Sequence, residues 1–398
     1  MINVLGINIS NLKKKQILEK IENFLNRGSQ AYAVTPNPEF ILEAQADEEF
    51  FYILNKADLA IPDGIGLKFA AWVLGKNIYR YTGADLVKTI LEKARSKKLE
   101  VRIGVVNWVS GLSKKQEIKK IIDSYNNKNL VVDIDRDAKM PQEMVDFKPN
   151  ILFCTLGAPW QEKFIYHNIE KILSVKLAIG VGGAFDFLTS KLKRAPKFIQ
   201  MIGLEWVWRL ILQPWRIKRM YKAAVIFPWE YIKWRFIHPF LYRKNVSCFL
   251  YKKENKIIKV LIVERENEKN HWQLPQGGTD GESLIKAGGR ELSEEINSKK
   301  FKSIAVFKNI HKYKFDYINK KAMHRGGIYQ KNLGYKGQKQ SLFIAEFTGV
   351  DDNIKINFWD HSSWKWVDAD NLVNSVFPTR QTATKKFYNK FKSLQITN

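Results

Sequence analysis

The sequence predicts an α/β protein in three parts: a mostly parallel, Rossmann-like sheet domain, a basic tryptophan-rich helical segment, and a smaller α+β domain. Apolar strand patterns alternate with helical patterns as far as about residue 202. Lysine, arginine and tryptophan then crowd together, and past Asn245 short β-rich runs surround a single clear helix. We therefore expect boundaries that give 1–190, 191–244 and 245–398.

In the first region, apolar residues from Ile17 to Leu25 recur at helical spacing, and another helix begins near Phe40. The predicted strands are Ala31–Val34, Val101–Val106, Leu130–Ile134, Ile151–Leu156 and Leu177–Val181. Strands that alternate with helices form a mostly parallel sheet, whose ligands bind at the carboxyl ends of the strands.

In the last region the elements are fewer. The predicted strands are Ser247–Tyr251, Ile257–Val263 and Leu342–Phe347, and the helix runs from Ser283 to Glu295. The two cysteines, Cys154 and Cys248, fall in different predicted domains, which excludes a disulfide framework and a cysteine-rich zinc site and suits a reducing cytoplasm.

The charge balance points to polyanionic partners. The chain has 66 lysines and arginines against 40 acidic residues, a net charge of +26. Nucleic acid, anionic lipid and diphosphate-bearing substrates all fit this excess. Between Lys191 and Lys244 the only acidic residues are Glu205 and Glu230, and five tryptophans are interleaved with the basic residues.

No stretch has the length and apolarity of a conventional spanning helix or of a signal peptide. The nearest candidate, Ala223 to Tyr242, is interrupted by Glu230, Lys233 and Arg235. We expect this segment to lie on a membrane, because tryptophan favours the interface and basic residues are drawn to anionic lipid. Single-stranded nucleic acid is the less favoured alternative partner.

The sharpest motif is a glycine turn that leads into an acidic helix. The turn holds Gly277 and Gly278 and is followed by Glu282. On the helix, Glu291, Glu294 and Glu295 share one face. Such carboxylates repel one another unless a cation such as Mg²⁺ or Mn²⁺ neutralises them, and the adjacent Arg290 could orient one of them. A solvated acidic helix face is the alternative, which the glycine turn and Glu282 disfavour.

From about Asn245 onward the sequence resembles the Nudix hydrolases, whose box reads G-x5-E-x7-REUxEE-x-GU. The loop from Gly277 to Glu282 is one residue shorter than that box, and Asn297 replaces its closing glycine. Asparagine tolerates the left-handed conformation that a glycine would adopt there.

His271-Trp-Gln-Leu-Pro-Gln-Gly-Gly278 and Tyr335-Lys-Gly-Gln-Lys-Gln340 are similar to the RNA pyrophosphohydrolase and dinucleoside-polyphosphate hydrolase branch, as are Trp364–Val367 and Phe387–Phe391. The resemblance implies metal-assisted hydrolysis of a nucleoside-diphosphate-linked compound. Glu294 and Glu295 would hold the metal, with Glu291 as ligand or base.

Lys336 and Lys339 are candidates to meet phosphate in that domain, and His271 and His311 are candidate pocket neighbours. We interpret the other four histidines as structural or surface residues.

In the first domain, polar side chains follow two predicted strands: Thr35 and Asn37 in one turn and Asp63 in another. An aspartate held in a rigid turn can accept a proton from a substrate hydroxyl. Alternatively, Asn37 and Asp63 only cap turns and helices.

Further motifs occur in a specific order, and together they resemble the WecB/TagA/CpsF glycosyltransferases from Met1 to about Tyr221. The set is Thr35-Pro-Asn37, Pro62-Asp-Gly64, Tyr81-Thr-Gly-Ala-Asp85, Leu156-Gly-Ala-Pro-Trp-Gln-Glu162, Gly180–Asp186, Arg194-Ala-Pro196, and Gly203-Leu-Glu-Trp206 through Arg209, Pro214 and Arg216. The resemblance implies inverting transfer of an N-acetylmannosamine-type sugar from UDP to a polyprenyl-diphosphate-linked N-acetylglucosamine, in surface polysaccharide synthesis.

By the same resemblance, Asp63 is the general base, Thr35 and Asn37 lie on the acceptor side, and Gln161 and Arg80 are pocket residues. Arg209, Arg216 and Arg219 match arginines that meet the lipid diphosphate. No metal is inferred for this domain, since no carboxylate cluster appears in it.

We therefore expect a two-enzyme fusion, cytoplasmic and peripheral on the inner face of a bacterial cell membrane. Two alternatives stay open. The Nudix-like domain could be a non-catalytic nucleotide-binding regulator, or the whole chain could be an RNA-processing pyrophosphohydrolase that the first domain tethers.

Overall fold

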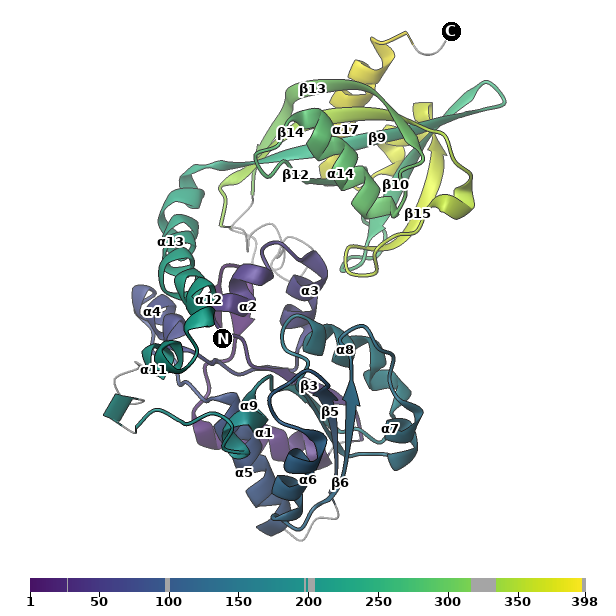
Figure 1. Cartoon of the computed structure of the whole chain (residues 1–398). Helices are drawn as coiled ribbons and strands as arrows, with labels where there is room; N and C mark the ends of the chain where they lie inside the picture. Colours follow the sequence, from purple (N-terminus) through teal and green to yellow (C-terminus); the bar gives the residue numbers. More distant parts are fainter. Residues whose placement is uncertain (27, 97–100, 197, 200–204, 316–333, 396–398) are drawn as a thin grey trace. The chain divides into compact units, whose positions relative to one another are not determined.

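The computed structural model describes residues 1–26, 28–96, 101–196, 198–199, 205–315 and 334–395. Gly203 and Leu204, named above as part of a motif, lie outside this range. The chain divides into two compact units, Met1–Ile232 and Lys233–Asn398, and each has its own sheet and its own hydrophobic core (Figure 1).

The main sheet of unit 1 is parallel throughout, which confirms the predicted sheet. Its strands lie side by side in the order β4, β3, β8, β7, β5, β6. In chain order they are β3 (Ala31–Val34), β4 (Leu59–Ala60), β5 (Arg102–Trp108), β6 (Lys128–Ile134), β7 (Ile151–Cys154) and β8 (Leu177–Gly180). A hairpin of β1 (Ile2–Val4) and β2 (Ile7–Ile9), which the sequence pattern did not predict, precedes them.

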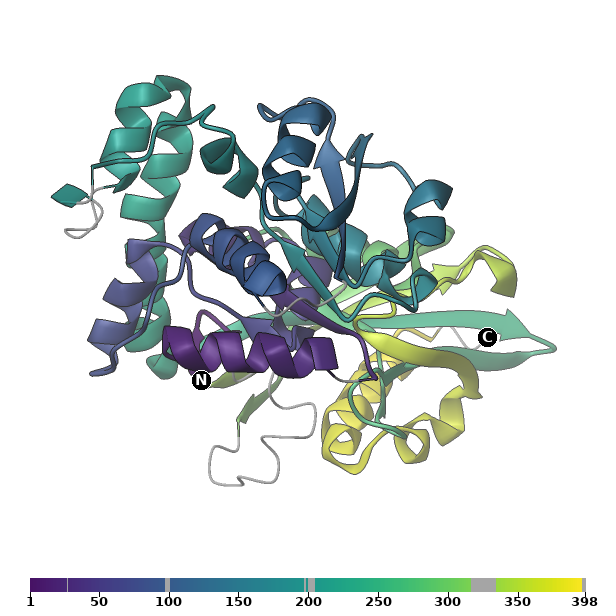
Figure 2. The same ribbon diagram turned by 90° about the horizontal axis from the view of Figure 1, so that it is seen from below.

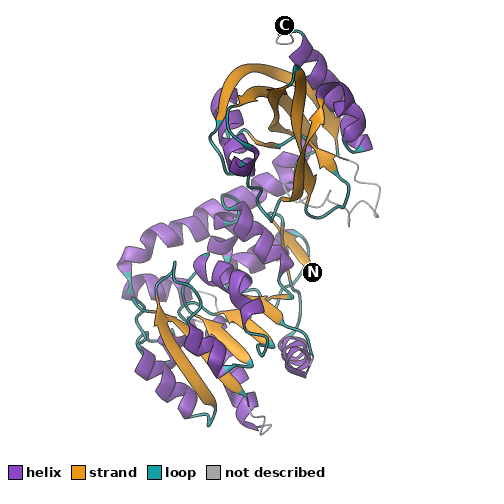
Figure 3. Cartoon of the chain, turned by 90° about the vertical axis from the view of Figure 1, so that its right-hand side faces the viewer, coloured by secondary structure: helices purple, strands orange, loops and turns teal. Residues whose placement is uncertain are grey.

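Helices cover both faces of this sheet (Figure 3). One face is covered by α1 (Lys14–Asn26), α5 (Gly83–Ser96), α6 (Lys115–Asp123) and α9 (Ala184–Leu188). The other face is covered by α3 (Glu48–Lys56), α7 (Gln142–Phe147) and α8 (Trp160–Asn168), which η1 (Ile169–Lys171) extends. In α5, Leu86, Ile90 and Leu91 are buried at helical spacing, and this apolar stripe holds the helix on the sheet.

The direction of the connections reverses between β3 and β8. From β3 the chain runs through α2 (Pro38–Glu43) and α3 to β4 at one edge, whereas β8 is entered from β7 on its other side. In open parallel sheets a ligand crevice forms at such a reversal, outside the carboxyl ends of the strands.

The basic, tryptophan-rich segment folds into helices that pack on α2 and α4 (Ile65–Val73) within unit 1 (Figure 2). They are α11 (Glu205–Leu212), η2 (Pro214–Arg216), α12 (Ile217–Tyr221), the π-helical η3 (Lys222–Ile226) and α13 (Phe227–Ile232). Phe227 and Tyr231 are buried, and the Tyr231 hydroxyl donates to the Ala70 carbonyl at 2.8 Å. Within the described ranges, no helix has both the length and the apolar character needed to cross a bilayer.

Unit 2 is built on a mixed sheet. It contains β9 (Tyr242–Glu254), β10 (Ile257–Arg265), β11 (Trp272–Gln273), β12 (Gln276–Gly278), β13 (Phe301–Lys314), β14 (Gly337–Phe347) and β15 (His361–Asp368). The main path is β11, β10, β9, β14, β13, with β12 paired to β9 and β15 to β10. The β9–β14 pair is parallel and the other pairs are antiparallel. The predicted strands lie within β9, β10 and β14, whereas β13 and β15 were not predicted.

Two helices of unit 2 cover opposite faces of this sheet. On one face, α14 (Leu284–Ile296) packs its Ala287, Leu292 and Ile296 against Val246 and neighbouring residues of β9 and β14. On the other, α17 (Pro378–Lys392) packs through Phe387 and Phe391. The remaining short helices of unit 2 are η4 (Lys233–Ile237), η5 (His238–Phe240), η7 (Asp351–Asn353), η8 (Ala369–Asn371) and α16 (Leu372–Ser375).

Two residues of the α14 region adopt the conformations that their types allow. A Cβ on Gly288 would lie 2.6 Å from the Cβ of Phe343, so glycine permits the close approach of helix and sheet. Asn297, which follows the helix, has φ 48° and ψ 37°, which confirms the expected left-handed cap.

Candidate active sites

A cavity of about 730 Å³ opens at the carboxyl edge of the sheet in unit 1. The turns that follow β3, β4, β5, β7 and β8 form most of its wall, and residues of the helical segment from Gln213 to Pro228 complete it. Among the predicted site residues, the cavity is lined by Thr35, Asn37, Asp63, Arg80, Gln161, Arg216 and Arg219. Arg209 lies in α11, and its side chain is outside the described part of the structure.

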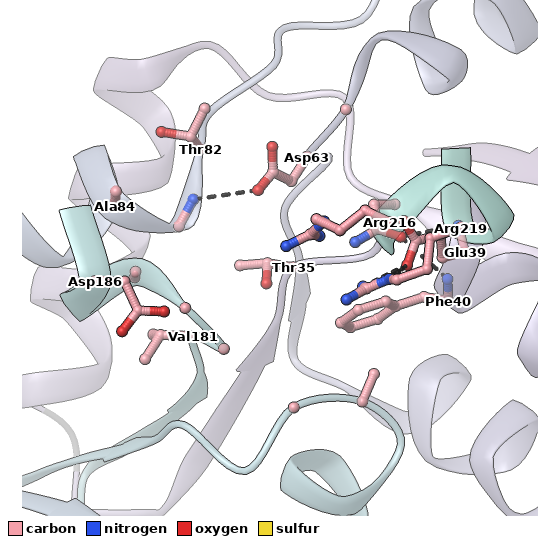
Figure 4. Close-up of a pocket in the computed structure, with 18 of the residues that line it drawn as sticks. Thr35, Glu39, Phe40, Asp63, Thr82, Ala84, Val181, Asp186, Arg216 and Arg219 are labelled. Carbon is pink, nitrogen blue, oxygen red and sulfur yellow. Dashed lines mark hydrogen bonds and ion pairs between the residues drawn. The ribbon is translucent and has the colours of Figure 1, made fainter. Parts of the chain in front are cut away.

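Two backbone groups, the Pro36 carbonyl and the Gly83 N–H, hold Asp63 in its turn. Its N–H donates to the Pro36 carbonyl at 2.9 Å, and Gly64 beside it has φ 103°, a value that favours glycine. The Gly83 N–H lies 3.4 Å from Oδ2, and Nε of Arg80 lies 3.6 Å from Oδ1. The carboxylate is 31% exposed and lines the cavity, so it can reach a bound hydroxyl (Figure 4).

Thr35 and Asn37 connect the turn after β3 to its surroundings. The Thr35 hydroxyl donates to the Gly180 carbonyl at 3.1 Å, which ties β3 to β8 where the connections reverse. The Asn37 side-chain oxygen accepts from the N–H groups of Glu39 and Phe40 and so caps α2. The capping role that the sequence left open for Asn37 is therefore present, in a residue that also lines the cavity.

Gln161 lines the cavity with a side chain that is otherwise buried, and Glu162 beside it is fully buried. The Gln161 oxygen accepts from the Gly182 N–H at 2.9 Å, and its amide nitrogen donates to Glu162 Oε1 at 2.6 Å. Glu162 is fully buried, and this burial raises its pKa from 4.5 to about 8, with the hydrogen bond from Gln161 opposing the rise. At neutral pH Glu162 is therefore largely a neutral acid that orients Gln161.

The arginines of the helical segment stand at the cavity wall opposite Asp186 in the view of Figure 4. Arg216 donates through Nη1 to the Gln213 side chain at 3.1 Å, and Nε of Arg219 lies 2.6 Å from Oε2 of Glu39. Trp215, which also lines the cavity, is 73% exposed. The cavity therefore joins a sheet-edge carboxylate to a basic, aromatic rim.

Sequence reasoning assigned no individual role to several residues of this cavity. Arg194 makes a bidentate pair with Asp85 at 2.7 and 2.9 Å, and Asp186 Oδ1 accepts from the backbone and hydroxyl of Ser113. Arg136 also lines the cavity. Arg194, Asp85 and Asp186 were named only as motif letters, and for Arg136 the one available signal was its position just after β6.

In unit 2 the predicted carboxylates gather around one arginine. Arg290 donates to Glu282 at 2.8 Å, Glu291 at 2.8 Å and Glu294 at 3.1 Å. It also reaches Asp280 and the Gly278 carbonyl, both at 3.0 Å. Burial lowers the pKa of Arg290, but the Glu282 hydrogen bond and the charges of Glu291 and Glu294 outweigh this and raise it. The predicted pairing of Arg290 is present, and it is shared among several carboxylates.

Glu291 and Glu295 are the buried members of this group. A Cβ on Gly277 would overlap the Glu291 carboxylate, so the glycine makes room for that side chain. Glu295 accepts from the Gln276 N–H at 2.9 Å, and its other oxygen lies 2.9 Å from Nε2 of His361. His361, interpreted from the sequence as a structural or surface residue, is buried against a predicted metal ligand.

The donor set suits a hard divalent cation, because α14 and the turn before it present several carboxylate oxygens. Within the described residues, however, no three carboxylate, histidine or cysteine side chains are grouped closely enough to hold a metal ion. Arg290 and His361 hold these carboxylates in the arrangement observed. The ligand set Glu291, Glu294 and Glu295 stays a prediction.

Lysines lie side by side on the α14 face of the sheet. The register places Lys339 of β14 between Lys244 of β9 and Lys312 of β13. Nζ of Lys312 lies 4.2 Å from the Tyr242 ring centroid and Nζ of Lys336 5.9 Å from it. Like charges on neighbouring strands repel one another, so this row favours an anionic ligand.

The opposite face at the same end carries amide side chains. Gln340 donates to the Gln276 oxygen at 2.8 Å, and the Tyr313 hydroxyl donates to the Gln338 oxygen at 2.6 Å. Asn245 Oδ1, Gln338 Nε2 and Gln340 Oε1 are buried and have no hydrogen-bond partner within the described residues. Such a mixed donor and acceptor set suits an uncharged heterocycle better than a phosphate.

The two histidines predicted as pocket neighbours lie near this amide cluster. His271 stacks on Phe377 at 4.1 Å and contacts Glu268 and Arg380. Burial and the charges of Arg380 and Arg265 lower its pKa to about 4, so it is neutral at pH 7. His311 lies opposite Gln340 on the neighbouring strand.

Unit 1 is thus an α/β domain with its cavity at a reversal in strand order, and unit 2 is an α+β domain with a glycine turn and a glutamate helix. The chain belongs to the glycosyl transferase WecG/TagA/CpsF family, whose family model matches residues 2–239, and residues 241–391 match the NUDIX domain.

Curated relatives divide along the same lines. An N-acetylglucosaminyldiphosphoundecaprenol N-acetyl-beta-D-mannosaminyltransferase of Bacillus subtilis (strain 168) is 32% identical over 213 residues, which covers 51% of this chain and 79% of that protein. An RNA pyrophosphohydrolase of Wolbachia pipientis subsp. Culex pipiens (strain wPip) is 34% identical over 157 residues, 38% of this chain and 91% of that protein. Among solved structures, a C. elegans Ap4A hydrolase binary complex aligns with 18% identity and a TM-score of 0.28, covering 38% of this chain and 98% of that one.

Both resemblances are therefore confirmed. The chain is a fusion of a glycosyltransferase-family domain, from a family of polysaccharide biosynthesis, and a Nudix hydrolase domain. Both families are families of enzymes, and Nudix domains generally use divalent metal ions.

Proposed function

We propose that unit 1 transfers an N-acetylmannosamine-type sugar from UDP to a polyprenyl-diphosphate-linked N-acetylglucosamine, with inversion, in surface polysaccharide synthesis. The observation that carries this proposal is the position of Asp63, which faces a cavity that Arg216 and Arg219 also line. A base for the acceptor hydroxyl and cations for a diphosphate thus share one space. The activity named for the Bacillus subtilis relative supports the substrates.

In this mechanism the Asp63 carboxylate accepts the proton of the acceptor hydroxyl as that oxygen attacks the anomeric carbon of the donor. The bond from the anomeric carbon to the diphosphate oxygen breaks, and UDP leaves with the electron pair. Attack from the face opposite the leaving group inverts the anomeric centre. Thr35, Asn37, Arg80 and Gln161 would shape the acceptor pocket and position Asp63.

The test is UDP release from UDP-N-acetylmannosamine, with and without a short polyprenyl-diphosphate-N-acetylglucosamine. We expect acceptor-dependent release that falls by about 100-fold or more in Asp63→Asn, because asparagine cannot take the proton. Asp146→Asn makes the same change at an exposed residue away from the cavity lining, where the acceptor for Gln142 is kept, and should change little. Release that ignores both acceptor and Asp63 would overturn the assignment.

We further propose that unit 1 works on the cytoplasmic face of a bacterial cell membrane, where its lipid-linked acceptor lies. Large apolar side chains of the helical segment are exposed beside basic ones, among them Ile211 at 68%, Trp215 at 73% and Trp229 at 57%. Aromatic and basic side chains together favour an anionic lipid interface.

Flotation with anionic vesicles tests the membrane proposal. The full chain should float, and the double change Val225→Ser with Trp229→Ser should reduce flotation, because both side chains are exposed on the segment. Leu173→Ser removes an even more exposed apolar side chain elsewhere on unit 1 and is the control. Equal flotation of all three proteins would contradict the assignment of this surface.

For unit 2 we propose metal-dependent hydrolysis of a nucleoside-diphosphate-linked compound. Glu291, Glu294 and Glu295 would hold a Mg²⁺ or Mn²⁺ ion, which when bound would supply charge neutralisation at the phosphates and an acidified water. The amide cluster, which includes Gln340 and Gln276, suits the base of such a compound.

Two other functions of unit 2 each have an observation in their favour. The pairing of Glu291 and Glu294 with Arg290 would suit a non-catalytic nucleotide-binding regulator. The lysine row and the name of the Wolbachia relative suit processing of RNA ends.

Glu294→Gln separates these functions. Hydrolysis of dinucleoside polyphosphates and of triphosphorylated RNA should be lost in this variant if unit 2 is an enzyme, whereas nucleotide binding without turnover in the wild type would identify a regulator. Turnover of RNA alone, with binding that weakens steeply as salt rises, would identify the RNA-processing function.

A further inference from the structure

The guanidinium of Arg136 is clamped between two indole rings in the cavity of unit 1. Its central carbon lies 3.9 Å from the Trp108 ring centroid and 4.2 Å from that of Trp160. Its Nε donates to the Leu156 carbonyl at 3.0 Å. Contact with two indole rings together with the Nε–H bond removes most of the freedom that an arginine side chain normally has.

This side chain crosses the carboxyl edge of the sheet. Arg136 follows β6, the edge strand, and Trp108 ends β5, yet Leu156 follows β7 on the far side of β5. Nη2 passes over the turn after β7, where a Cβ on Gly157 would lie only 3.6 Å away. Arg136 therefore places a cation over the middle of the ligand-binding edge.

The two Nη groups of Arg136 are the donors left for a ligand. Its central carbon lies over the Trp108 and Trp160 rings, and its Nε–H donates to the Leu156 carbonyl. In the part of the chain that the structure describes, no carboxylate forms an ion pair with Arg136. A buried or half-buried guanidinium without a carboxylate partner carries an uncompensated positive charge and therefore favours binding of an anion.

Arg219 adds a second cation to this region. Arg136 and Arg219 line the same cavity. Burial and, after it, the positive charge of Arg219 lower the pKa of Arg136. Arg219 itself is paired with Glu39, and Glu39 also lines the cavity. Glu39 is thus the counter-ion of Arg219, whereas Arg136 has no carboxylate partner within the described residues. A dianionic ligand would neutralise both guanidinium groups.

We propose that Arg136 and Arg219 form a diphosphate subsite, in which Arg136 is the fixed donor and Arg219 exchanges Glu39 for the ligand. Two guanidinium groups match two linked phosphates better than one, because each fork can take a separate phosphate. The inference rests on the proposed transferase function, because that function supplies the diphosphate. The diphosphate belongs either to the UDP of the donor or to the lipid-linked acceptor.

The experiment measures pyrophosphate binding to the full chain by calorimetry, with EDTA present so that metal-dependent binding in unit 2 is absent. Arg136→Gln should weaken binding by about tenfold or more, the loss expected for a charge-assisted contact. Glu39→Gln should strengthen binding, because the competitor for Arg219 is gone. Opposite changes in affinity from two variants in one cavity cannot both result from misfolding, which only weakens binding.

Arg102→Gln is the matched control. Arg102 also donates its Nε to a backbone carbonyl, that of Lys148 at 2.8 Å, but at the amino end of β5 rather than its carboxyl end. It removes the same charge and should leave pyrophosphate binding unchanged. Equal weakening by Arg102→Gln and Arg136→Gln, unchanged binding in Arg136→Gln, or weaker binding in Glu39→Gln would overturn the subsite.

Two further titrations identify the source of the diphosphate. If the subsite holds the donor, the preference for UDP over UMP should collapse in Arg136→Gln. If it holds the acceptor, that preference should persist while the KM for the polyprenyl-diphosphate acceptor rises. Because pyrophosphate binding is measured without turnover, wild-type protein that binds pyrophosphate through Arg136 but transfers no sugar would refute the proposed function alone.

Discussion

At the scale of single residues, Glu162 shows how a carboxyl group behaves when the fold gives it no water. Burial raises its pKa from 4.5 to about 8. At pH values between these two, the folded chain therefore keeps a proton that the unfolded chain has released. The free energy of unfolding should therefore fall as pH rises through this window, by at most about 1.4 kcal/mol per pH unit. Below 4.5 and above about 8 the contribution is flat.

Glu162→Gln should remove this pH dependence, because glutamine keeps the acceptor for Gln161 and cannot ionise. The variant should gain stability relative to the wild type as pH rises from about 5 to about 8, as measured by urea unfolding followed through tryptophan fluorescence. Glu170→Gln, an exposed change, is the control. Stability differences that do not vary with pH would contradict the assigned protonation.

Sequence patterns located the site residues that directly follow strands. They did not locate the residues whose contacts are with partners far away in the chain. Asp63 and Thr35 lie where their turns predicted, since a parallel sheet brings its carboxyl ends together. Arg136 and His361 act through partners distant in the chain, Leu156 and Glu295, and no local spacing encodes such pairs.

At the scale of elements, two adjacent glycines of α14 have opposite surroundings. A Cβ on Gly288 would press on Phe343, whereas a Cβ on Gly289 would meet nothing within 4 Å. Gly288→Ala should lower the free energy of unfolding of unit 2 by about 1–3 kcal/mol through overpacking. Gly289→Ala should raise it by about 0.5–1 kcal/mol, because alanine is the better helix former.

Denaturant unfolding of the full chain, with the transition of unit 2 followed separately, checks this pair. The two variants differ only in which neighbouring position carries the methyl group, so each is the control for the other. Shifts of the same sign would mean that packing against Phe343 does not set the spacing between α14 and the sheet.

Most strands that the sequence predicted in unit 1 have a continuous apolar run. The strands β3, β5, β7 and β8 of unit 1 are such runs, and each is buried on both sides. By contrast, β13 is mostly exposed or half-buried and rich in lysine, and β15 alternates polar residues with tryptophan. These strands form because β14 and β10 offer free edges for hydrogen bonding, which is a tertiary cause.

At the scale of the whole molecule, the two candidate sites are built from residues of different units. We expect their activities to be separable. Asp63→Asn should abolish sugar transfer and leave nucleotide hydrolysis within about twofold, and Glu294→Gln should do the reverse, because independent sites contribute additively. Parallel assays on the same preparations check this expectation.

Loss of both activities in either variant would contradict separability and indicate that the two units are coupled. The double variant then measures the coupling, since any departure from the product of the single effects reports it.

The net charge of the chain follows from the sequence, but the positions of the charged side chains in space do not. The excess of +26 pointed to anionic partners of several kinds. Only the fold places Arg216 and Arg219 on a cavity wall and Lys339 between two other lysines. The total charge therefore indicates the kind of partner, and the placement of the basic residues indicates where an anionic ligand would contact each unit.

The overlap between Gly277 and the Glu291 carboxylate has a consequence for descent. Position 277 cannot gain a side chain while Glu291 is kept, because its Cβ would displace the carboxylate. Among relatives, lineages that have replaced this glutamate by a shorter residue should be released to carry alanine or serine at the glycine. Lineages that still depend on the glutamate should keep both the glycine and the glutamate. The identities of these two residues in a relative therefore indicate whether its domain is still under selection for the acidic helix.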